Sequence, residues 1–349
     1  MPNLVVAGAG MAGLVTAARA RELGADVVVH EKGDRPGGSM ALSSCVVWRY
    51  REWETFRSEC PGGDPVLQRL VWERLDDALA WLESLGAPVV VRETGNPRTT
   101  GVRFDPRGLT EALTRRVGEV RLGDPLVELP ADVPAILATG GFQGNRELVR
   151  RHVTTEELIL RANPWSAGDG LRLALERGAG LSEGLDEFYG RNMAALPRPF
   201  VPGELVSLAQ VYARHALVEN ARGERFDPQH WSDLDVVQWT ARQPGARAWY
   251  LVRDDALGER VRERTVGEII EAARQAGAPV DRRAGATRVE VKAAITTTLG
   301  GIRVDEQARA AEGLWAAGAD AGGISTGGWS SALASALVLG RIAAEDALE

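Results

Sequence analysis

A glycine-rich loop near the start of the chain constrains the fold more than any other feature of the sequence. Residues 8–13 read GAGMAG, which fits the pattern G-x-G-x-x-G, and they follow the short apolar run LVVA at residues 4–7. The apolar run is typical of a buried parallel strand, and residues 14–23 have the composition of a helix. This order of strand, glycine turn and helix predicts the first half of a dinucleotide-binding unit.

Each glycine of the loop has a separate expected role. Gly8 would permit the tight turn, Gly10 would let the backbone approach a pyrophosphate, and Gly13 would let the helix pack on the strand. A second apolar strand is predicted over residues 27–30, and Glu31 follows it, 18 residues after Gly13. An acid at this place accepts hydrogen bonds from ribose hydroxyls and disfavours the 2′-phosphate of NADP. NAD and FAD both remain open on these residues.

Five segments in the same order resemble the FAD-contacting motifs of the fumarate reductase and succinate dehydrogenase flavoprotein family. They are the loop at 8–13, the stretch from EK to PGGSMALS at 31–43, LATGGFQGN at 137–145, AGDG at 167–170 and GLWAAGAD at 313–320. The resemblance covers most of the chain and implies FAD rather than NAD. It also implies noncovalent FAD, because Ser39–Ser44 contains no His of the kind to which some members attach the flavin.

The resemblance implies an α/β fold with two parts. The first is a Rossmann-like FAD-binding domain, a parallel sheet with helices on both faces, which we expect over residues 1–186 and 288–349. The second is an inserted α+β domain that caps the substrate, which we expect over residues 187–287. After Gly180 the residues Trp, Tyr, Pro and Arg become more frequent and the helical periodicity weakens, which favours a boundary there.

The motifs also indicate which residues bind the cofactor. Asp320 stands where many family members carry Glu, and the resemblance implies that its carboxylate binds the ribityl hydroxyls. A helix from about Leu333 to Ala344 would place its N-terminus beside the flavin pyrimidine, where its dipole stabilises negative charge on the reduced ring. The expected FAD-binding residues are Gly8, Gly10, Met11, Ala12, Gly13, Glu31, Lys32, Gly38, Ser39, Ala41, Ser43, Ala138, Thr139, Gly140, Asp169, Gly318, Asp320, Gly328, Ser331 and Leu333.

Three charged residues with which fumarate-reducing members hold their substrate are missing from the matching motifs. The run ITTTLGG at 295–301 has Thr297 in the place of a His, and ISTGG at 324–328 lacks an Arg. The segment GERF at 223–226 is present, but residues 227–235 contain no proton-donating Arg. We therefore expect a substrate other than fumarate or succinate.

The resemblance implies hydride transfer between flavin N5 and a C–C bond that is alpha,beta to a carbonyl, in either direction, on a small organic substrate. Candidate acid–base and substrate-binding groups are Tyr189, Arg191, Tyr212, His215 and Thr297. Steroid dehydrogenase-like members offer only an analogy, because GWSS at 328–331 lacks their Tyr. A flavin oxidase that uses oxygen, or an FAD-binding protein that has lost catalysis, are the alternatives.

Composition excludes several other classes. The net charge is −7 and no basic block occurs, which argues against nucleic-acid binding. No apolar run reaches the roughly 20 residues of a membrane helix, and no basic leader precedes the first strand. The two cysteines, Cys45 and Cys60, predict neither a disulfide framework nor a metal site. We expect a cytoplasmic protein without metal, whose electron donor or acceptor the sequence does not identify.

Overall fold

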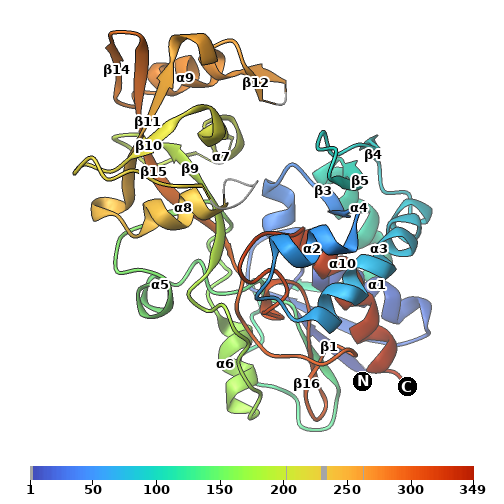
Figure 1. Cartoon of the computed structure of the whole chain (residues 1–349). Helices are drawn as coiled ribbons and strands as arrows, with labels where there is room; N and C mark the ends of the chain where they lie inside the picture. Colours follow the sequence, from blue (N-terminus) through green and yellow to red (C-terminus); the bar gives the residue numbers. More distant parts are fainter. Residues whose placement is uncertain (1–2, 202, 229–233, 262) are drawn as a thin grey trace. The chain divides into compact units, whose positions relative to one another are not determined.

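The computed structural model describes residues 3–201, 203–228, 234–261 and 263–349 (Figure 1). The chain forms two compact units. The first unit comprises Met1–Leu148, Ala162–Glu187 and Thr297–Glu349, and the second comprises Val149–Arg161 and Phe188–Thr296.

These limits differ in two places from the expected insertion over 187–287. Residues 149–161 belong to the second unit, and the chain returns to the first unit at Thr297 instead of residue 288. The reason is β15 (Ala286–Thr298), one uninterrupted strand of 13 residues that holds most of its length in the sheet of the second unit. It pairs with β11 (Arg247–Arg253) as far as Lys292 and then, at Ala294 and Ile295, with β8 (Ile159–Leu160).

A six-stranded sheet organises the first unit. All neighbouring pairs in it are parallel except the edge strand β16 with β17. The four residues of β1 are all buried, as expected for a central parallel strand. Ala7 at the end of β1 lies opposite His30 of β2 and Leu137 of β7, and Leu137 lies opposite Ala316 of β17. In order, the strands are β16 (Arg309–Ala311), β17 (Leu314–Ala316), β7 (Ala135–Leu137), β1 (Leu4–Ala7), β2 (Val27–Glu31) and β6 (Glu119–Leu122).

Because these strands are in register, the loops that carry four of the expected FAD motifs all leave the same edge of the sheet. Ligands of parallel α/β sheets bind at this carboxyl edge. The predicted α/β class with a parallel sheet is confirmed. Apolar runs predicted the strands at residues 4–7 and 27–30, whereas the neighbours and the register of all six strands are observations of the structure.

Helices α1 (Met11–Glu22) and α10 (Ala332–Asp346) are the most closely packed pair of the first unit (Figure 1). A Cβ added at Gly340 would lie 2.9 Å from the carbonyl oxygen of Ala12, and Thr16 Oγ1 donates a hydrogen bond of 3.0 Å to the carbonyl of Gly340. The other elements of this unit are η1 (Gly38–Leu42), β3 (Val46–Tyr50), α2 (Trp53–Glu59), α3 (Pro65–Ser84), β4 (Val89–Val91), β5 (Thr99–Phe104), α4 (Pro106–Val117), α6 (Asp169–Glu176) and η5 (Gly318–Asp320), while α5 (Arg146–His152) spans the limit between the units.

The second unit is built on β15, which pairs antiparallel with β11 and β14 and parallel with β8. Tyr212, Tyr250, Val252 and Val289 are buried in its core. Its elements are β8 (Ile159–Leu160), β9 (Phe188–Ala194), α7 (Glu204–Ser207), η2 (Ala213–His215), β10 (Leu217–Glu219), α8 (Leu234–Ala241), η3 (Pro244–Ala246), β11 (Arg247–Arg253), η4 (Asp254–Ala256), β12 (Arg260–Val261), β13 (Arg264–Thr265), α9 (Val266–Gln275) and β14 (Val280–Arg283).

Both cysteines are buried free thiols in the first unit, and burial raises the pKa of Cys45 to about 12 and that of Cys60 further. Across the described ranges, no helix is both long enough and apolar enough to span a membrane.

Candidate cofactor site and active-site pocket

Two glycines of the first loop are required by close packing. Gly8 has a φ of +104°, and a Cβ there would lie 2.2 Å from the carbonyl oxygen of Ala138. A Cβ at Gly13 would lie 1.8 Å from the carbonyl oxygen of Gly8. The expected roles of both residues, a tight turn and close packing of helix on strand, therefore match the local geometry.

Gly10 differs from its two neighbours in the motif. It is the N-cap of α1, and a Cβ at this position would meet no described atom within 4 Å. In the described chain α1 has no side-chain cap and no acidic residue in its first turn. The helix thus begins with N–H groups, at Met11 and Ala12, that no protein side chain caps. This open, electropositive helix end fits the pyrophosphate of FAD.

Glu31 fixes the backbone of the glycine loop through hydrogen bonds. Its Oε2 accepts a 2.7 Å hydrogen bond from the N–H of Ala9, and its Oε1 accepts one of 2.6 Å from the N–H of Gly33. The side chain is buried, so both bonds are made at low dielectric. A ribose hydroxyl would share this carboxylate with two backbone donors. Next to it, the Lys32 ammonium lies 2.8 Å from the Asp169 carboxylate at the start of α6.

Asp320 has partners that the sequence did not indicate. Its Oδ2 accepts hydrogen bonds from the N–H and the hydroxyl of Thr139, at 2.5 and 2.9 Å, and its Oδ1 accepts one of 3.0 Å from the N–H of Gly141. The Thr139 hydroxyl in turn accepts from the N–H of Gly170. Burial raises the pKa of Asp320, while these donors act in the opposite direction.

This network joins three of the expected FAD motifs around one buried carboxylate. A Cβ at Gly170 would lie 2.5 Å from Asp320 Oδ2, so the second glycine of AGDG is needed for the approach. The role expected for Asp320, binding of the ribityl hydroxyls, stays a prediction; the described structure shows that both of its oxygens accept hydrogen bonds from the 139–141 turn. A ribityl hydroxyl would share this carboxylate with those donors.

The second motif forms the short helix η1, which follows a glycine turn. Gly38 has a φ of +51°, and a Cβ there would lie 3.1 Å from the Cα of Gly10. Ser39 Oγ accepts a 2.9 Å hydrogen bond from Asn163 Nδ2, and Ser43 Oγ donates one to the carbonyl of Met40. Ala41 lies on the exposed side of the turn. The structure thus places Gly38 next to the glycine loop at residues 8–13.

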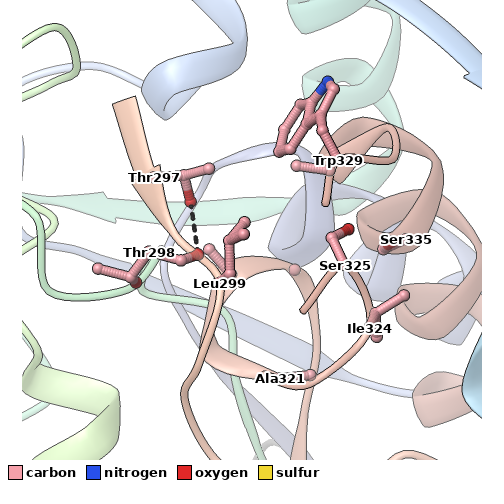
Figure 2. A pocket seen from close by; sticks show the side chains of 11 residues that line it. Thr297, Thr298, Leu299, Ala321, Ile324, Ser325, Trp329 and Ser335 are labelled. Atoms are coloured by element: carbon pink, nitrogen blue, oxygen red, sulfur yellow. Dashed lines mark hydrogen bonds between the residues drawn. The ribbon is translucent and has the colours of Figure 1, made fainter. Parts of the chain in front are cut away.

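A small pocket that is partly open to solvent lies in the first unit at the start of α10 (Figure 2). Ser331 caps this helix, because its hydroxyl accepts a 3.3 Å hydrogen bond from the N–H of Ala334. Leu333 is half-buried, and Gly328 has no room for a side chain, since a Cβ would lie 1.6 Å from the carbonyl of Glu59. The lining residues are Thr297, Thr298, Leu299, Gly318, Ala319, Ala321, Ile324, Ser325, Trp329, Ala332 and Ser335.

The lining of this pocket contains hydroxyl and apolar groups and no charged side chain. Thr297, which was expected in the place of a substrate-binding His, lines it, and its hydroxyl donates a 3.3 Å bond to the carbonyl of Thr298 (Figure 2). Ser325 Oγ lies 2.6 Å from Ser330 Oγ. Trp329 was not singled out by the sequence; a signal was present, because it directly follows the final glycine pair.

Two of the other candidate residues share one face of β9 in the second unit. Tyr189 and Arg191 are alternate residues of the strand, both half-buried, and the guanidinium carbon of Arg191 lies 5.2 Å from the centre of the Tyr189 ring. His215 ends η2, where its Nε2 accepts a hydrogen bond of 3.1 Å from Arg214 Nε.

The expectation for Tyr212 is corrected by its position. The side chain is fully buried, its hydroxyl donates a 2.8 Å hydrogen bond to Gln210 Oε1, and its ring meets that of Tyr250 edge to face. Burial raises the pKa of Tyr212 well above that of a free tyrosine. This residue belongs to the core of the second unit and has no access to a substrate. Its residue type and its place in the sequence made Tyr212 a candidate, and neither carries information about burial.

Comparisons with known proteins agree with this geometry. The family model described as "FAD binding domain" matches residues 3–129 and 126–331. The chain is 25% identical, over 307 residues, to the "Fumarate reductase (cytochrome)" of Shewanella frigidimarina, a match that covers 73% of this chain and 52% of that protein. The chain thus spans about half the length of the curated relatives it matches. It belongs to the FAD-binding-domain family, whose cofactor is FAD.

Solved structures share the fold. An open conformation of a flavocytochrome c3 fumarate reductase superposes with a TM-score of 0.72 at 20% identity, covering 99% of this chain and 78% of that chain. A 3-ketosteroid delta1-dehydrogenase from Sterolibacterium denitrificans gives a TM-score of 0.76 at 15% identity, covering 99% of both chains. Within the described residues, no group of three or more His, Cys, Asp or Glu side chains could hold a metal ion.

Two glycines of the same loop allow a matched test of the cofactor site. Gly13→Ala should lower the free energy of unfolding by about 3 kcal/mol, because its Cβ overlaps the Gly8 carbonyl. Gly10→Ala should leave the thermal unfolding of the FAD-free protein unchanged and weaken FAD binding at least ten-fold, because its methyl group occupies the open space at the start of α1. Thermal unfolding and FAD titration measure the two effects. Unchanged FAD affinity in Gly10→Ala would place the pyrophosphate elsewhere.

Asp320→Asn tests the buried network. The amide offers one acceptor oxygen in place of two, so at least one N–H of Thr139 or Gly141 loses its partner, at a cost of about 1–3 kcal/mol in the free energy of unfolding. The amount of FAD bound after purification should also be lower in Asp320→Asn than in the wild type. Asp76→Asn, which removes an exposed partner of Arg49, is the control and should leave both quantities nearly unchanged.

Proposed function

We propose that the chain is an FAD-dependent oxidoreductase that acts on a C–C bond alpha,beta to a carbonyl, and that its substrate is an uncharged organic molecule instead of a dicarboxylate. The observation that carries this proposal is the pocket at the start of α10, which is lined by hydroxyls, an indole and aliphatic groups. A pocket that held a carboxylate away from water would need a cation or several donors for it.

The sequence at the same place supports this choice of substrate. Thr297 occupies the position of the His, and Ser325 and Thr326 precede the glycine pair where fumarate-reducing members carry an Arg. The expected position of the third charge falls in 227–235, of which 229–233 lie outside the described residues; by sequence this stretch contains no Arg. Hydroxyls such as those of Thr297 and Ser325 can donate to a neutral carbonyl oxygen.

FAD, when bound, supplies the hydride chemistry at N5. The residues of the chain then have two tasks. The N-terminus of α10 presents the positive end of a 15-residue helix to the pocket, through Ala332 and Ser335. In the second unit, Tyr189 is proposed to move the proton at the neighbouring carbon, and Arg191, whose guanidinium lies near the Tyr189 ring, to polarise the carbonyl.

The relatives illustrate both kinds of substrate. The curated relatives are named as fumarate reductases, whereas the ketosteroid dehydrogenase with a similar fold was solved with 1,4-androstadiene-3,17-dione, an uncharged ketone. The uncharged pocket lining of this chain favours an uncharged ketone over a dicarboxylate, and this inference does not specify a steroid.

The test begins with the reduced protein under anaerobic conditions. Excess reductant is removed, and reoxidation of the flavin is followed at its visible absorbance with fumarate, with a panel of cyclic enones, and with oxygen. We expect an enone to reoxidise the flavin faster than fumarate by at least a hundred-fold. Rapid reoxidation by fumarate would contradict the proposed substrate class, and reaction with oxygen alone would indicate an oxidase.

Two tyrosines of the second unit provide a matched pair for the proton transfer. Tyr189→Phe should lower kcat on the best enone about a hundred-fold, because it removes the proposed acid. Tyr212→Phe should leave kcat unchanged and lower the free energy of unfolding by about 1 kcal/mol, through loss of its bond to Gln210. Equal kcat values for the wild type and Tyr189→Phe would exclude Tyr189 as the group that transfers the proton.

A further inference from the structure

One short segment contacts two of the FAD motifs and directly precedes a third, although none of the five motifs includes it. It is Asn163–Ser166, with the sequence NPWS, just before AGDG. Asn163 Nδ2 donates to Ser39 Oγ and lies 3.8 Å from where a Cβ of Gly38 would be. A Cβ at Gly140 would lie 2.8 Å from Ser166 Oγ. The segment therefore runs from the η1 turn to the 138–141 turn.

Between these two contacts, Trp165 lies against the backbone that follows Glu31. A Cβ at Gly33 would lie 2.7–2.9 Å from three atoms of the six-membered ring, Cε3, Cδ2 and Cζ3, so the indole packs directly on Gly33. The N–H of Gly33 is itself bound to Glu31 Oε1. The ring thus packs on Gly33, which lies two residues after Glu31 in the sequence, and Glu31 is the residue expected to bind the ribose.

Hydrogen bonds within the chain fix the conformation of the segment. Asn163 Oδ1 accepts hydrogen bonds from the N–H groups of Trp165 and Ser166, at 3.0 and 3.1 Å, and the carbonyl of Ser166 accepts one of 2.7 Å from Gly144. Asn163 is buried, whereas Trp165 is only half-buried. An aromatic ring is therefore held in one place with part of its surface accessible.

One face of this ring already accepts a planar group. The guanidinium carbon of Arg35, an exposed side chain, lies 5.6 Å from the centre of the Trp165 ring. Guanidinium groups and nucleobases use the same kind of surface, because both stack on an aromatic face. A purine attached to a ribose at Glu31 would find such a face next to it.

We propose that Trp165 binds the adenosine half of FAD by stacking on the adenine, and that NPWS is a recognition element for that half of the cofactor. The inference rests on FAD as the cofactor of the family and is independent of the reaction proposed above. It assigns a ligand-binding role to a residue that lies outside the glycine motifs.

The test uses the flavin-free full chain and two fragments of the cofactor, ADP and riboflavin, in calorimetric titrations. Trp165→Ala should weaken ADP binding about ten-fold or more and leave riboflavin binding unchanged. Trp165→Phe should retain most of the ADP affinity, because it keeps an aromatic face, and Trp165→Leu should not, because it only fills the space against Gly33. Trp329→Ala, in the pocket of α10, is the matched control with the opposite expectation: weaker riboflavin and unchanged ADP.

Three results would overturn the proposal. ADP affinity that is unchanged in Trp165→Ala would show that adenine does not contact the indole. Full ADP affinity in Trp165→Leu would show that bulk at Gly33, and not stacking, is what matters. Equal loss of ADP and riboflavin binding in Trp165→Ala would show that the residue only maintains the fold of the loop. None of these readouts depends on turnover, so the outcome is separate from that of the enone experiment.

Discussion

Two buried carboxylates that bind backbone N–H groups hold the edge of the parallel sheet together. Glu31 bonds to Ala9 and Gly33 at the end of β2, and Asp320 bonds to Thr139 and Gly141 beyond the end of β17. Glycine turns lack side chains that could fix their conformation, and their conformational entropy opposes order. A charge-assisted hydrogen bond at low dielectric is strong enough to select one conformation of each turn.

This arrangement explains why so many glycines are concentrated in the site. Gly8, Gly13 and Gly170 all stand where a Cβ would overlap an oxygen atom of a neighbouring turn. Gly10 alone among the three glycines of the first loop faces open space. The crowded glycines bring the loops together, and the open one leaves free space at the start of α1, where we expect the cofactor. The glycine pattern of the first loop therefore has two physical effects: it allows the backbone to pack closely, and it leaves free space at the start of α1.

The two units differ in what they can contribute to the chemistry. The pocket of the first unit contains hydroxyls and an indole without a charged side chain in its lining, and so it is suited to orient a neutral group beside the end of α10. The titratable candidates that remain, Tyr189, Arg191 and His215, all belong to the second unit. The lack of charged residues in the pocket lining agrees with the sequence, in which Thr297 and Ser325 stand where fumarate-reducing members of the family carry charged residues.

The sequence by itself determined the strand–turn–helix at residues 4–23, the FAD motifs and their order, because each depends on local conformation and on residue types at fixed spacing. It also showed which substrate-binding charges are absent. Only the tertiary structure decided that Tyr212 is buried, that β15 carries the second unit to Thr296, that Asp320 accepts hydrogen bonds from the 139–141 turn, and that Trp165 lies on Gly33. These four facts depend on which segments meet across more than 100 residues of chain or on which face of an element is covered, and neither is encoded in a local pattern.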